Sequence, residues 1–269
     1  MYPYIHFFGR TIASYGFMCV IGCFAALGCA LLGCRRQKAA LDNMFYMFIF
    51  IFFCALIGAK LLYLIPHISD FWVYRDFIFA SIQNFGQYIG SGFVFYGGLI
   101  GGIFGPILYA HFFKEDALPL VQAFVPAIPL FHCIGRIGCF LAGCCYGIEF
   151  HGVLAVTFTN AVGGAPNGIP LLPVQLIEAG ANLITFIILI IYNYKPKKPL
   201  QPFGLYLMIY GIERFIFEFF RGDLVRGGLL GLSTSQWISL LLVPLGIWLF
   251  IVKPEKNWLA VKGLRHKIV

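Results

Sequence analysis

Residues 12–33 read IASYGFMCVIGCFAALGCALLG and contain no charged side chain. A helix that crosses a bilayer needs about 20 mainly apolar residues, so this run is long enough to span one. The segment CRRQK, residues 34–38, follows directly and adds basic side chains. A single arginine and no lysine precede the run, which is a poor signal-peptide pattern. We therefore predict a retained transmembrane helix.

Further apolar runs of similar length follow along the chain. Together they give seven candidate spans: 12–33, 44–65, 93–113, 118–141, 173–194, 203–220 and 235–252. Of the 269 residues, 60% are hydrophobic and 11% are charged, whereas a soluble domain averages about 25% charged residues. The sequence therefore predicts an all-α polytopic membrane protein, with residues 1–269 forming one integral membrane domain.

Lysine and arginine are concentrated in alternate gaps between the spans. The gaps after the first, third, fifth and seventh spans include Arg35, Arg36, Lys38, Lys114, Lys195, Lys197, Lys198, Lys253, Lys256, Lys262, Arg265 and Lys267. The other gaps contain only Arg75, Arg221 and Arg226. The positive-inside rule then predicts that the N-terminus lies outside and the C-terminus inside. The net charge of +8 thus reflects topology rather than binding to nucleic acid.

Two gaps on the predicted outer side are long, residues 66–92 and 142–172. The first contains PHISDFWVYRDF, whose aromatic side chains suit a lipid–water interface. The second contains TFTNAVGGAPNGIP, which is rich in turn-forming residues. We expect these loops to form a small extracytoplasmic cap.

The sixth span carries ionisable residues, which are costly in lipid and so indicate function. Arg214, Glu218 and Arg221 are spaced i, i+4 and i+7, so a helix would place them on one face. One interpretation is a structural ion pair that fixes helix packing. The other is that both guanidinium groups bind an anion such as a lipid phosphate, because the planar fork of arginine suits phosphate.

A second candidate site is GRIGCFLAGCCYG, residues 135–147. Its glycines make a helix through the whole segment doubtful, and they permit close backbone approach. Arg136 together with glycine-rich backbone is a plausible phosphate cradle. The spacing of Cys139, Cys144 and Cys145, with His132 and Cys133 nearby, matches no standard zinc pattern. We therefore predict no metal and no cofactor. A disulfide, a lipid or acyl acceptor and thiol exchange remain open for these cysteines.

A third group begins the fifth span, where Gln175 and Glu178 are three positions apart on one face. Glu178 also fits the simpler role of an acid that complements the helix dipole. Tyr15 and Tyr96 lie next to glycine in or near spans, where a tyrosine is more often a packing or interfacial residue. The segment GGLIGG, residues 97–102, most simply permits close helix packing.

Four segments in this order resemble the prolipoprotein diacylglyceryl transferases of the bacterial cytoplasmic membrane. They are YGGLIGG, GRIGCFLAGCCYG, PVQLIE and ERFIFEFFR. The resemblance runs from ASYG near residue 15 to FFRGD near residue 223. It implies a metal-free transfer of a diacylglyceryl group from phosphatidylglycerol to the lipobox cysteine of a prolipoprotein signal peptide, with glycerol phosphate released.

The resemblance also implies roles for individual residues. Arg136 would contact the lipid headgroup, and Arg214 would be a second essential arginine with Glu218 as its partner. The residues assigned to substrate binding are Tyr15, Gly97, Gly98, Cys139, Gly143, Gly147, Gln175, Glu178, Glu218 and Arg221. Membrane lipid and the preprotein are the implied partners, and the bacterial inner membrane is the implied location.

The chain departs from the family pattern in two places. Tyr96 stands where the family usually has a histidine, so we include Tyr96 and His132 among the catalytic candidates. Cysteines and Ala142 replace the asparagines and the acidic or amide residue of the family signature. Two rival functions follow: a divergent enzyme that uses another acceptor or its own cysteines, and a non-enzymatic lipid-binding or transport protein.

Overall fold

A computed structural model describes residues 2–7, 9–37, 39–90, 92, 94–194, 198, 200–223 and 228–252. The chain divides into two compact units. One unit comprises Met1–Lys38 and Gln122–Pro254, and the other comprises Ala39–Val121 and Glu255–Val269. The candidate site residues belong to the first unit, except Tyr96, Gly97 and Gly98, which belong to the second.

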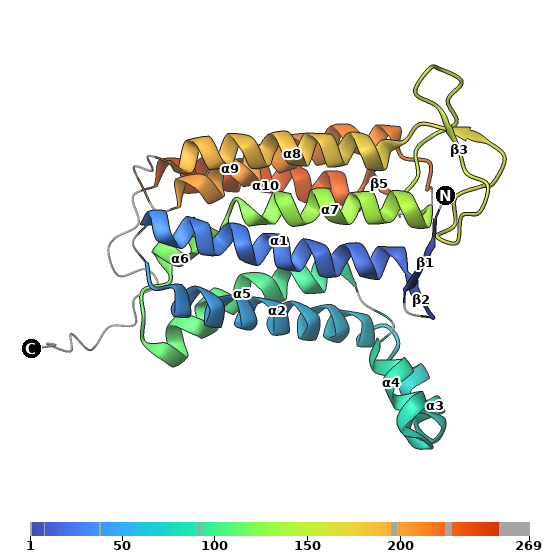
Figure 1. Ribbon diagram of the computed structural model, residues 1–269, viewed down its shortest axis with the longest axis horizontal. Coiled ribbons are helices and arrows are strands. Elements are labelled where there is room, and N and C mark those ends of the chain that lie inside the picture. The colour runs from blue at the N-terminus through green and yellow to red at the C-terminus, as the bar shows by residue number, and fades with distance from the viewer. Residues whose placement is uncertain are drawn as a thin grey trace, which may run out of the picture. The chain divides into compact units, whose positions relative to one another are not determined.

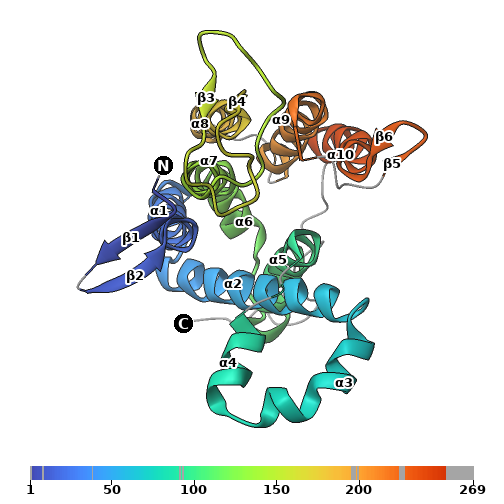
Figure 2. The same ribbon diagram turned by 90° about the vertical axis from the view of Figure 1, so that its right-hand side faces the viewer.

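Five long helices build the first unit. They are α1 (Ser14–Gln37), α7 (Ala127–Ala142), α8 (Val174–Asn193), α9 (Gln201–Phe217) and α10 (Thr234–Ile251). Within this unit, α7 packs between α1 and α8, and α9 packs between α8 and α10 (Figure 1 and Figure 2). The site described below therefore lies among helices that are consecutive neighbours.

Small residues let these helices approach closely, as is common between membrane helices. Helices α1 and α7 run antiparallel, because Gly22 packs on Phe131 near the start of α7 while Gly138, near the end of α7, faces Tyr15 at the start of α1. Helices α9 and α10 meet where Gly204 and Gly246 lie against each other's carbonyl groups. These contacts leave no room for larger side chains at the crossing points.

Two short hairpins and the last residues of a short helix also belong to this unit. Strands β1 (Tyr4–Phe7) and β2 (Arg10–Ala13) pair antiparallel before α1, and β5 (Gly228–Leu229) pairs with β6 (Leu232–Ser233) before α10. The start of α10 is a capping box between Ser233 and Gln236, which satisfies amide groups that a helix N-terminus leaves unpaired. Helix α6 (Leu118–Phe124) precedes α7.

The loop between α7 and α8 folds into a cap with its own small core. Strands β3 (Val156–Thr157) and β4 (Pro170–Leu171) pair antiparallel, and Phe158, Ala165 and Leu171 are buried beneath them. The cap is joined to the end of α9 by a bridge between Gly147 and Arg221. The loop 142–172 is thus a folded cap, while its expected extracytoplasmic position stays a prediction.

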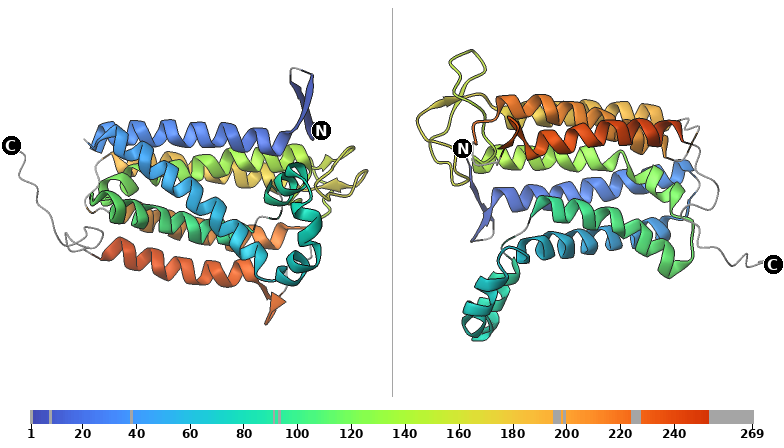
Figure 3. Two further views of the ribbon diagram at one scale, coloured as in Figure 1. Left: turned by 90° about the horizontal axis from the view of Figure 1, so that it is seen from below. Right: turned by 180° about the vertical axis from the view of Figure 1, so that it is seen from behind.

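The second unit consists of α2 (Leu41–Leu64), α3 (Ile68–Phe79), α4 (Ile82–Gly90) and α5 (Phe95–Phe113). Helices α2 and α5 lie side by side (Figure 3), with Gly97 and Gly101 of α5 against the backbone of α2. This confirms the packing interpretation of GGLIGG. Segment 66–92, expected as a loop, instead folds largely into α3 and α4.

Several apolar helices in the described residues make this a multi-pass membrane protein. Five are long and apolar enough to span a bilayer: Ser14–Gln37, Leu41–Leu64, Leu118–Ala142, Val174–Asn193 and Thr234–Ile251. Helix α9 has 17 residues, and the described apolar stretch of α5, Gly97–Phe113, is also shorter than the five spans above. The total of seven spans therefore stays a prediction. The fourth span is not one continuous helix, because α6 and α7 are separated by Val125 and Pro126.

Candidate functional site

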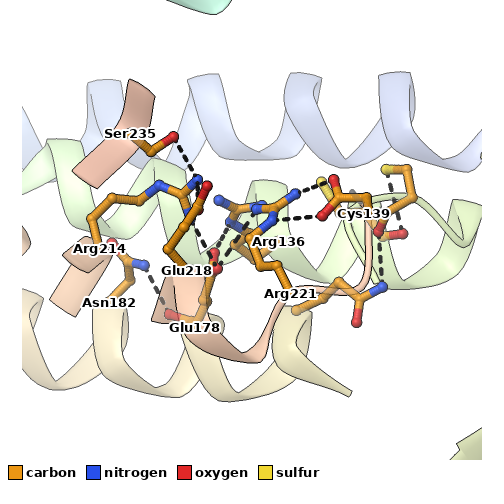
Figure 4. A network of polar contacts seen from close by, with 11 residues as sticks. Arg136, Cys139, Glu178, Asn182, Arg214, Glu218, Arg221 and Ser235 are labelled. Atoms are coloured by element: carbon orange, nitrogen blue, oxygen red, sulfur yellow. Dashed lines mark hydrogen bonds and ion pairs between the residues drawn. The ribbon is translucent and has the colours of Figure 1, made fainter. Parts of the chain in front are cut away.

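Three arginines from separate segments gather around one carboxylate. Arg136 on α7 places Nε 2.5 Å from Oε2 of Glu178 on α8. Oε1 of Glu178 lies 3.6 Å from Nη1 of Arg214 and 3.8 Å from Nη1 of Arg221. Figure 4 shows this convergence, with Glu178 between the guanidinium groups. Glu178 is 4% exposed, so it is a buried shared partner and not an ordinary surface acid at a helix start.

Arg214 is held from two further directions. Its Nη2 lies 2.6 Å from Oε2 of Glu218, one helical turn later, which confirms the pairing expected from the i, i+4 spacing. The same nitrogen donates a hydrogen bond of 3.0 Å to Oγ of Ser235, at the start of α10. Helices α8, α9 and α10 thus fix one guanidinium group.

Arg221 reaches the cluster by a different route from the one predicted. Helix α9 ends at Phe217, a single 3₁₀ turn covers Glu218–Phe220, and Arg221 is extended with ψ of 137°. The expectation that Arg221 shares a helix face with Arg214 is therefore wrong. Its guanidinium instead makes a two-pronged contact with Asp223, with Nε–Oδ1 and Nη2–Oδ2 distances of 2.8 Å and 2.6 Å.

The cluster is balanced in charge and incompletely hydrogen-bonded. Its three guanidinium groups face the carboxylates of Glu178, Glu218 and Asp223. Burying so many charges costs several kcal/mol per ion before pairing, so stability alone is a weak reason for it. Nε of Arg136, Nη1 of Arg214 and Oε1 of Glu178 are buried and have no aligned hydrogen bond, despite their ion-pair contacts.

The segment 135–147 is helical for longer than its glycines indicated. Gly135 and Gly138 lie inside α7, so helix continues to Ala142. Gly143 then has a φ of +72°, which glycine adopts without a steric cost, and it ends the helix. Gly147 lies against Leu172, Val174 and Phe220, so close approach rather than turning explains this glycine.

The cysteines of this segment lie beside the arginine cluster. Cys139 is on α7 one turn after Arg136, and Cys144 and Cys145 follow the helix end. Gln175 donates a hydrogen bond of 2.8 Å to the carbonyl of Cys144, while its Oε1 is buried without a partner. Gln175 thus connects the start of α8 to this turn and retains one unused acceptor.

The structure places the other predicted residues as follows. Tyr15 lies on α1 against Gly138, although its side chain is 47% exposed. The ring of His132 packs against that of Tyr210 at a centroid distance of 5.5 Å. Tyr96 is the second residue of α5, and its side chain lies outside the described part of the structure. Gly97 and Gly98 belong to the second unit, where they face α2.

Three polar residues near the cluster were missed by the sequence analysis. Asp223 holds Arg221, Ser235 accepts from Arg214, and Asn182 donates 2.8 Å to the carbonyl of Glu178. Asp223 had a local signal, because it follows Arg221 by two positions. Ser235 had none, because it is brought to Arg214 by the packing of α10 on α9.

The geometry of paired arginines inside an apolar bundle fits a site for an anionic lipid, and comparison with known proteins decides the family. A model described as prolipoprotein diacylglyceryl transferase matches residues 3–252 of this chain. The chain belongs to this family. The predicted resemblance is therefore confirmed, and the chain is a transferase.

Individual members of the prolipoprotein diacylglyceryl transferase family are similar over most of their length. A phosphatidylglycerol–prolipoprotein diacylglyceryl transferase of Clostridium tetani is 38% identical over 245 residues, covering 90% of this chain and 94% of that protein. One of Clostridium perfringens, named transferase 2, is 35% identical over 250 residues, covering 93% and 94%. One of Dehalococcoides mccartyi is 29% identical over 254 residues, covering 94% of each.

Proposed function

We propose that this chain transfers a diacylglyceryl group from phosphatidylglycerol to the cysteine thiol of a prolipoprotein lipobox. The thiol sulfur attacks the glyceryl carbon that carries the phosphate ester. The carbon–oxygen bond breaks, a thioether forms, the thiol loses its proton, and glycerol phosphate leaves with the bonding electrons. The observation that carries this proposal is the buried arginine cluster in a chain of this family.

Arg136 and Arg214 are proposed to bind the phosphodiester of the donor lipid. Negative charge grows on the phosphate oxygens as the ester bond breaks, and preorganised donors in a dry site stabilise that charge. Nε of Arg136 and Nη1 of Arg214 are buried donors of this cluster without an aligned hydrogen bond, although both lie in ion-pair contact with Glu178. Glu178 and Glu218 then act as positioning residues, since each holds a guanidinium group in place.

The attacking sulfur reacts as a thiolate, so the thiol proton needs an acceptor. His132 is our candidate proton acceptor, because it lies on α7 one turn before Arg136 and on the same face of that helix. Tyr96, at the position of the usual family histidine, is the second candidate. Tyr15, Gln175, Arg221, Cys139, Gly143 and Gly147, all in the first unit, are proposed to line the lipid and peptide site. Gly97 and Gly98 pack against α2 in the second unit, so they are not included in this lining.

We also propose the bacterial inner membrane as the location, with the cap on its outer face. Because α1 and α7 are antiparallel, the start of α1 and the cap lie at one end of their unit. Arg35 and Arg36 end α1 at the opposite end, which the positive-inside rule assigns to the cytoplasm. The basic residues Lys195, Lys197 and 253–267, used in the same prediction, lie outside the described residues.

A reconstituted assay tests the proposed reaction. The purified chain, phosphatidylglycerol and a lipobox peptide should give a thioether-linked diacylglyceryl peptide and glycerol phosphate, both detected by mass spectrometry. Replacing phosphatidylglycerol with phosphatidylcholine is the donor control. Replacing the lipobox cysteine with serine in the peptide is the acceptor control. Complementation of cells depleted of their own diacylglyceryl transferase provides the test in a membrane.

The same assay separates the rival functions. Lipid binding without any product would support a binding or transport protein. A covalent diacylglyceryl mass on the chain itself, lost in Cys139→Ser, Cys144→Ser or Cys145→Ser, would support transfer to its own cysteine. Either result, with correctly folded protein and no modified peptide, contradicts the proposed acceptor.

A further inference from the structure

Three cysteine side chains meet beside the arginine cluster. The sulfur atoms of Cys139, Cys144 and Cys145 all lie within 4.8 Å of one another. All three thiols are free, and Cys139 is buried. The diacylglyceryl transfer proposed above uses the thiol of the peptide, so it gives no reason for three thiols in the enzyme to converge.

The end of α7 brings the first two sulfurs together. The amide of Gly143 donates to the carbonyl of Phe140 at 3.3 Å, and the amide of Cys144 donates to that of Cys139 at 3.0 Å. This pair of hydrogen bonds is the Schellman motif. In this motif, the residue that follows the helix-ending glycine commonly contacts the residue whose carbonyl accepts its amide. Here those two positions are Cys144 and Cys139.

An unusual backbone conformation brings in the third sulfur. Cys145 has a φ of +54°, a region that costs about 1 kcal/mol or more for a residue with a side chain. The turn around it is held by hydrogen bonds from Gly163 to Ala142 and from Gly222 to Tyr146, each 2.9 Å. The fold therefore maintains a strained residue with its thiol next to the other two.

Three converging thiols form a set of ligands for a soft metal ion. Thiolates select ions such as Zn²⁺ and Cu⁺ over harder cations. With metal–sulfur bonds of about 2.3 Å, the sulfurs of such a site lie about 4 Å apart. Sulfurs already within 4.8 Å can reach that separation by small side-chain rotations.

The neighbouring charges suit a site of this kind. Three thiolates around a monovalent or divalent ion carry a net negative charge. The guanidinium groups of Arg136 and Arg221 are close enough to Cys145 to interact electrostatically with its sulfur. They lie next to that charge, although Glu178 and Asp223 already pair with them.

We propose that Cys139, Cys144 and Cys145 bind one thiophilic d¹⁰ metal ion, of the class of Zn²⁺ and Cu⁺, through three thiolates. This site differs from the metal-free prediction, which rested on the sequence spacing and on the family resemblance. The sequence spacing matches no standard zinc pattern. Instead, the turn that ends α7 brings Cys139 and Cys144 together, and the left-handed backbone conformation of Cys145 places the third sulfur beside them.

Metal binding by the purified full-length chain tests the site without any lipid or peptide. Reduced, chelator-treated protein is titrated with Cd²⁺, and the ultraviolet charge-transfer band of cadmium thiolates is followed. We expect the band to saturate at one equivalent. Zn²⁺ or Cu⁺ should be retained at one ion per chain after gel filtration and should raise the thermal unfolding temperature.

Single substitutions locate the ligands. Cys139→Ser, Cys144→Ser and Cys145→Ser should each weaken Cd²⁺ binding by at least about tenfold. Cys133→Ser is the matched control, because it removes a buried thiol of α7 outside the trio and should bind as the wild type does. Cys145→Gly removes the thiol while accommodating the positive φ, so weak binding in this variant cannot be attributed to strain.

The proposal is overturned if the chain with all three serines binds Cd²⁺ as tightly as the wild type. It is equally overturned if folded, reduced wild-type protein takes up no metal. Neither result depends on catalysis, so the failure of this site and the failure of the proposed transferase reaction are separate outcomes.

Discussion

Arg136 and Glu178, on neighbouring helices α7 and α8, form the shortest ion pair of the arginine cluster, with 2.5 Å between Nε and Oε2. Their contact joins the segment that carries the family signature to the segment PVQLIE. Because Glu178 also faces Arg214 and Arg221, one carboxylate contacts three guanidinium groups. The predictions that follow test this arrangement and the turn beside it.

Removing Arg136 should disable the proposed reaction. Arg136→Ala is expected to lower kcat/KM for diacylglyceryl transfer by at least about 100-fold, because it removes a donor to the developing phosphate charge. Arg136→Lys retains the charge but not the planar fork, so a loss of at least about tenfold is expected. Product formation by mass spectrometry measures both effects. Arg36→Ala, at the exposed end of α1, is the control, and equal losses in all variants would contradict the assignment.

The ion pairs that Glu178 makes with Arg136 and with Arg221 should differ in coupling energy. In double-mutant cycles, Glu178→Gln with Arg136→Gln is expected to show at least about 1 kcal/mol of coupling in unfolding stability. Glu178→Gln with Arg221→Gln should show less, because that pair is 3.8 Å apart and Asp223 already holds Arg221. Denaturation of detergent-solubilised protein measures the cycle. The reverse order of coupling energies would mean that Arg221 is the main partner of Glu178.

Two glycines of the same motif should respond oppositely to alanine. A Cβ on Gly147 would lie 2.6 Å from Cγ2 of Val174 and closer still to the carbonyl of Leu172. Gly147→Ala should therefore lower the unfolding temperature and detach the cap from Arg221. A Cβ on Gly135 meets nothing within 4 Å, so Gly135→Ala should be neutral or stabilise the helix by up to about 1 kcal/mol. Equal destabilisation by both variants would contradict this packing.

Cys145 should react as an acidic thiol when no metal is bound. Hydrogen bonding to Cys139 and Cys144 lowers the pKa of the Cys145 thiol below its ordinary value, and the guanidinium groups of Arg136 and Arg221 lower it further. A lowered pKa keeps the thiolate present as the pH falls toward neutral, so alkylation of Cys145 should persist there.

Pulse alkylation of chelator-treated protein followed by peptide mass spectrometry gives the pH profile. Arg221→Gln should move the profile of Cys145 to higher pH, because it removes a nearby positive charge. A wild-type profile that coincides with that of a free cysteine in the same solution would show that the pKa of Cys145 is not lowered.

The sequence identified Arg136, Arg214, Glu218 and Glu178 by a simple argument, namely that ionisable groups in apolar runs are costly. It also located most helices, because runs of about 20 apolar residues are an unambiguous signal. The pairing of Glu178 with three arginines was not predictable, since it depends on how α7, α8 and α9 pack. No local pattern encodes that packing.

One prediction was wrong and another was correct only in part, each for a physical reason. Arg221 was placed on a helix by its spacing, but α9 ends four residues earlier and the chain extends to pair with Gly147. The doubt about a helix through all of 135–147 was justified, because Gly143 ends α7, but Gly135 and Gly138 are accommodated inside α7, which is packed between α1 and α8. In both cases tertiary contacts outweigh local tendencies.

The two ends of the cap between α7 and α8 are joined to each other by hydrogen bonds. At its base, the amide of Leu172 donates to the carbonyl of Ile148 at 2.9 Å, and the amide of Ile148 donates to Phe220 at 3.0 Å. Its tip is fully exposed at Val153. Because the entropy of closing a loop grows only slowly with its length, residues inserted at this tip would cost little and would leave the base unchanged. The segment that faces the surroundings is therefore free to change in length and shape while the buried charges stay where they are.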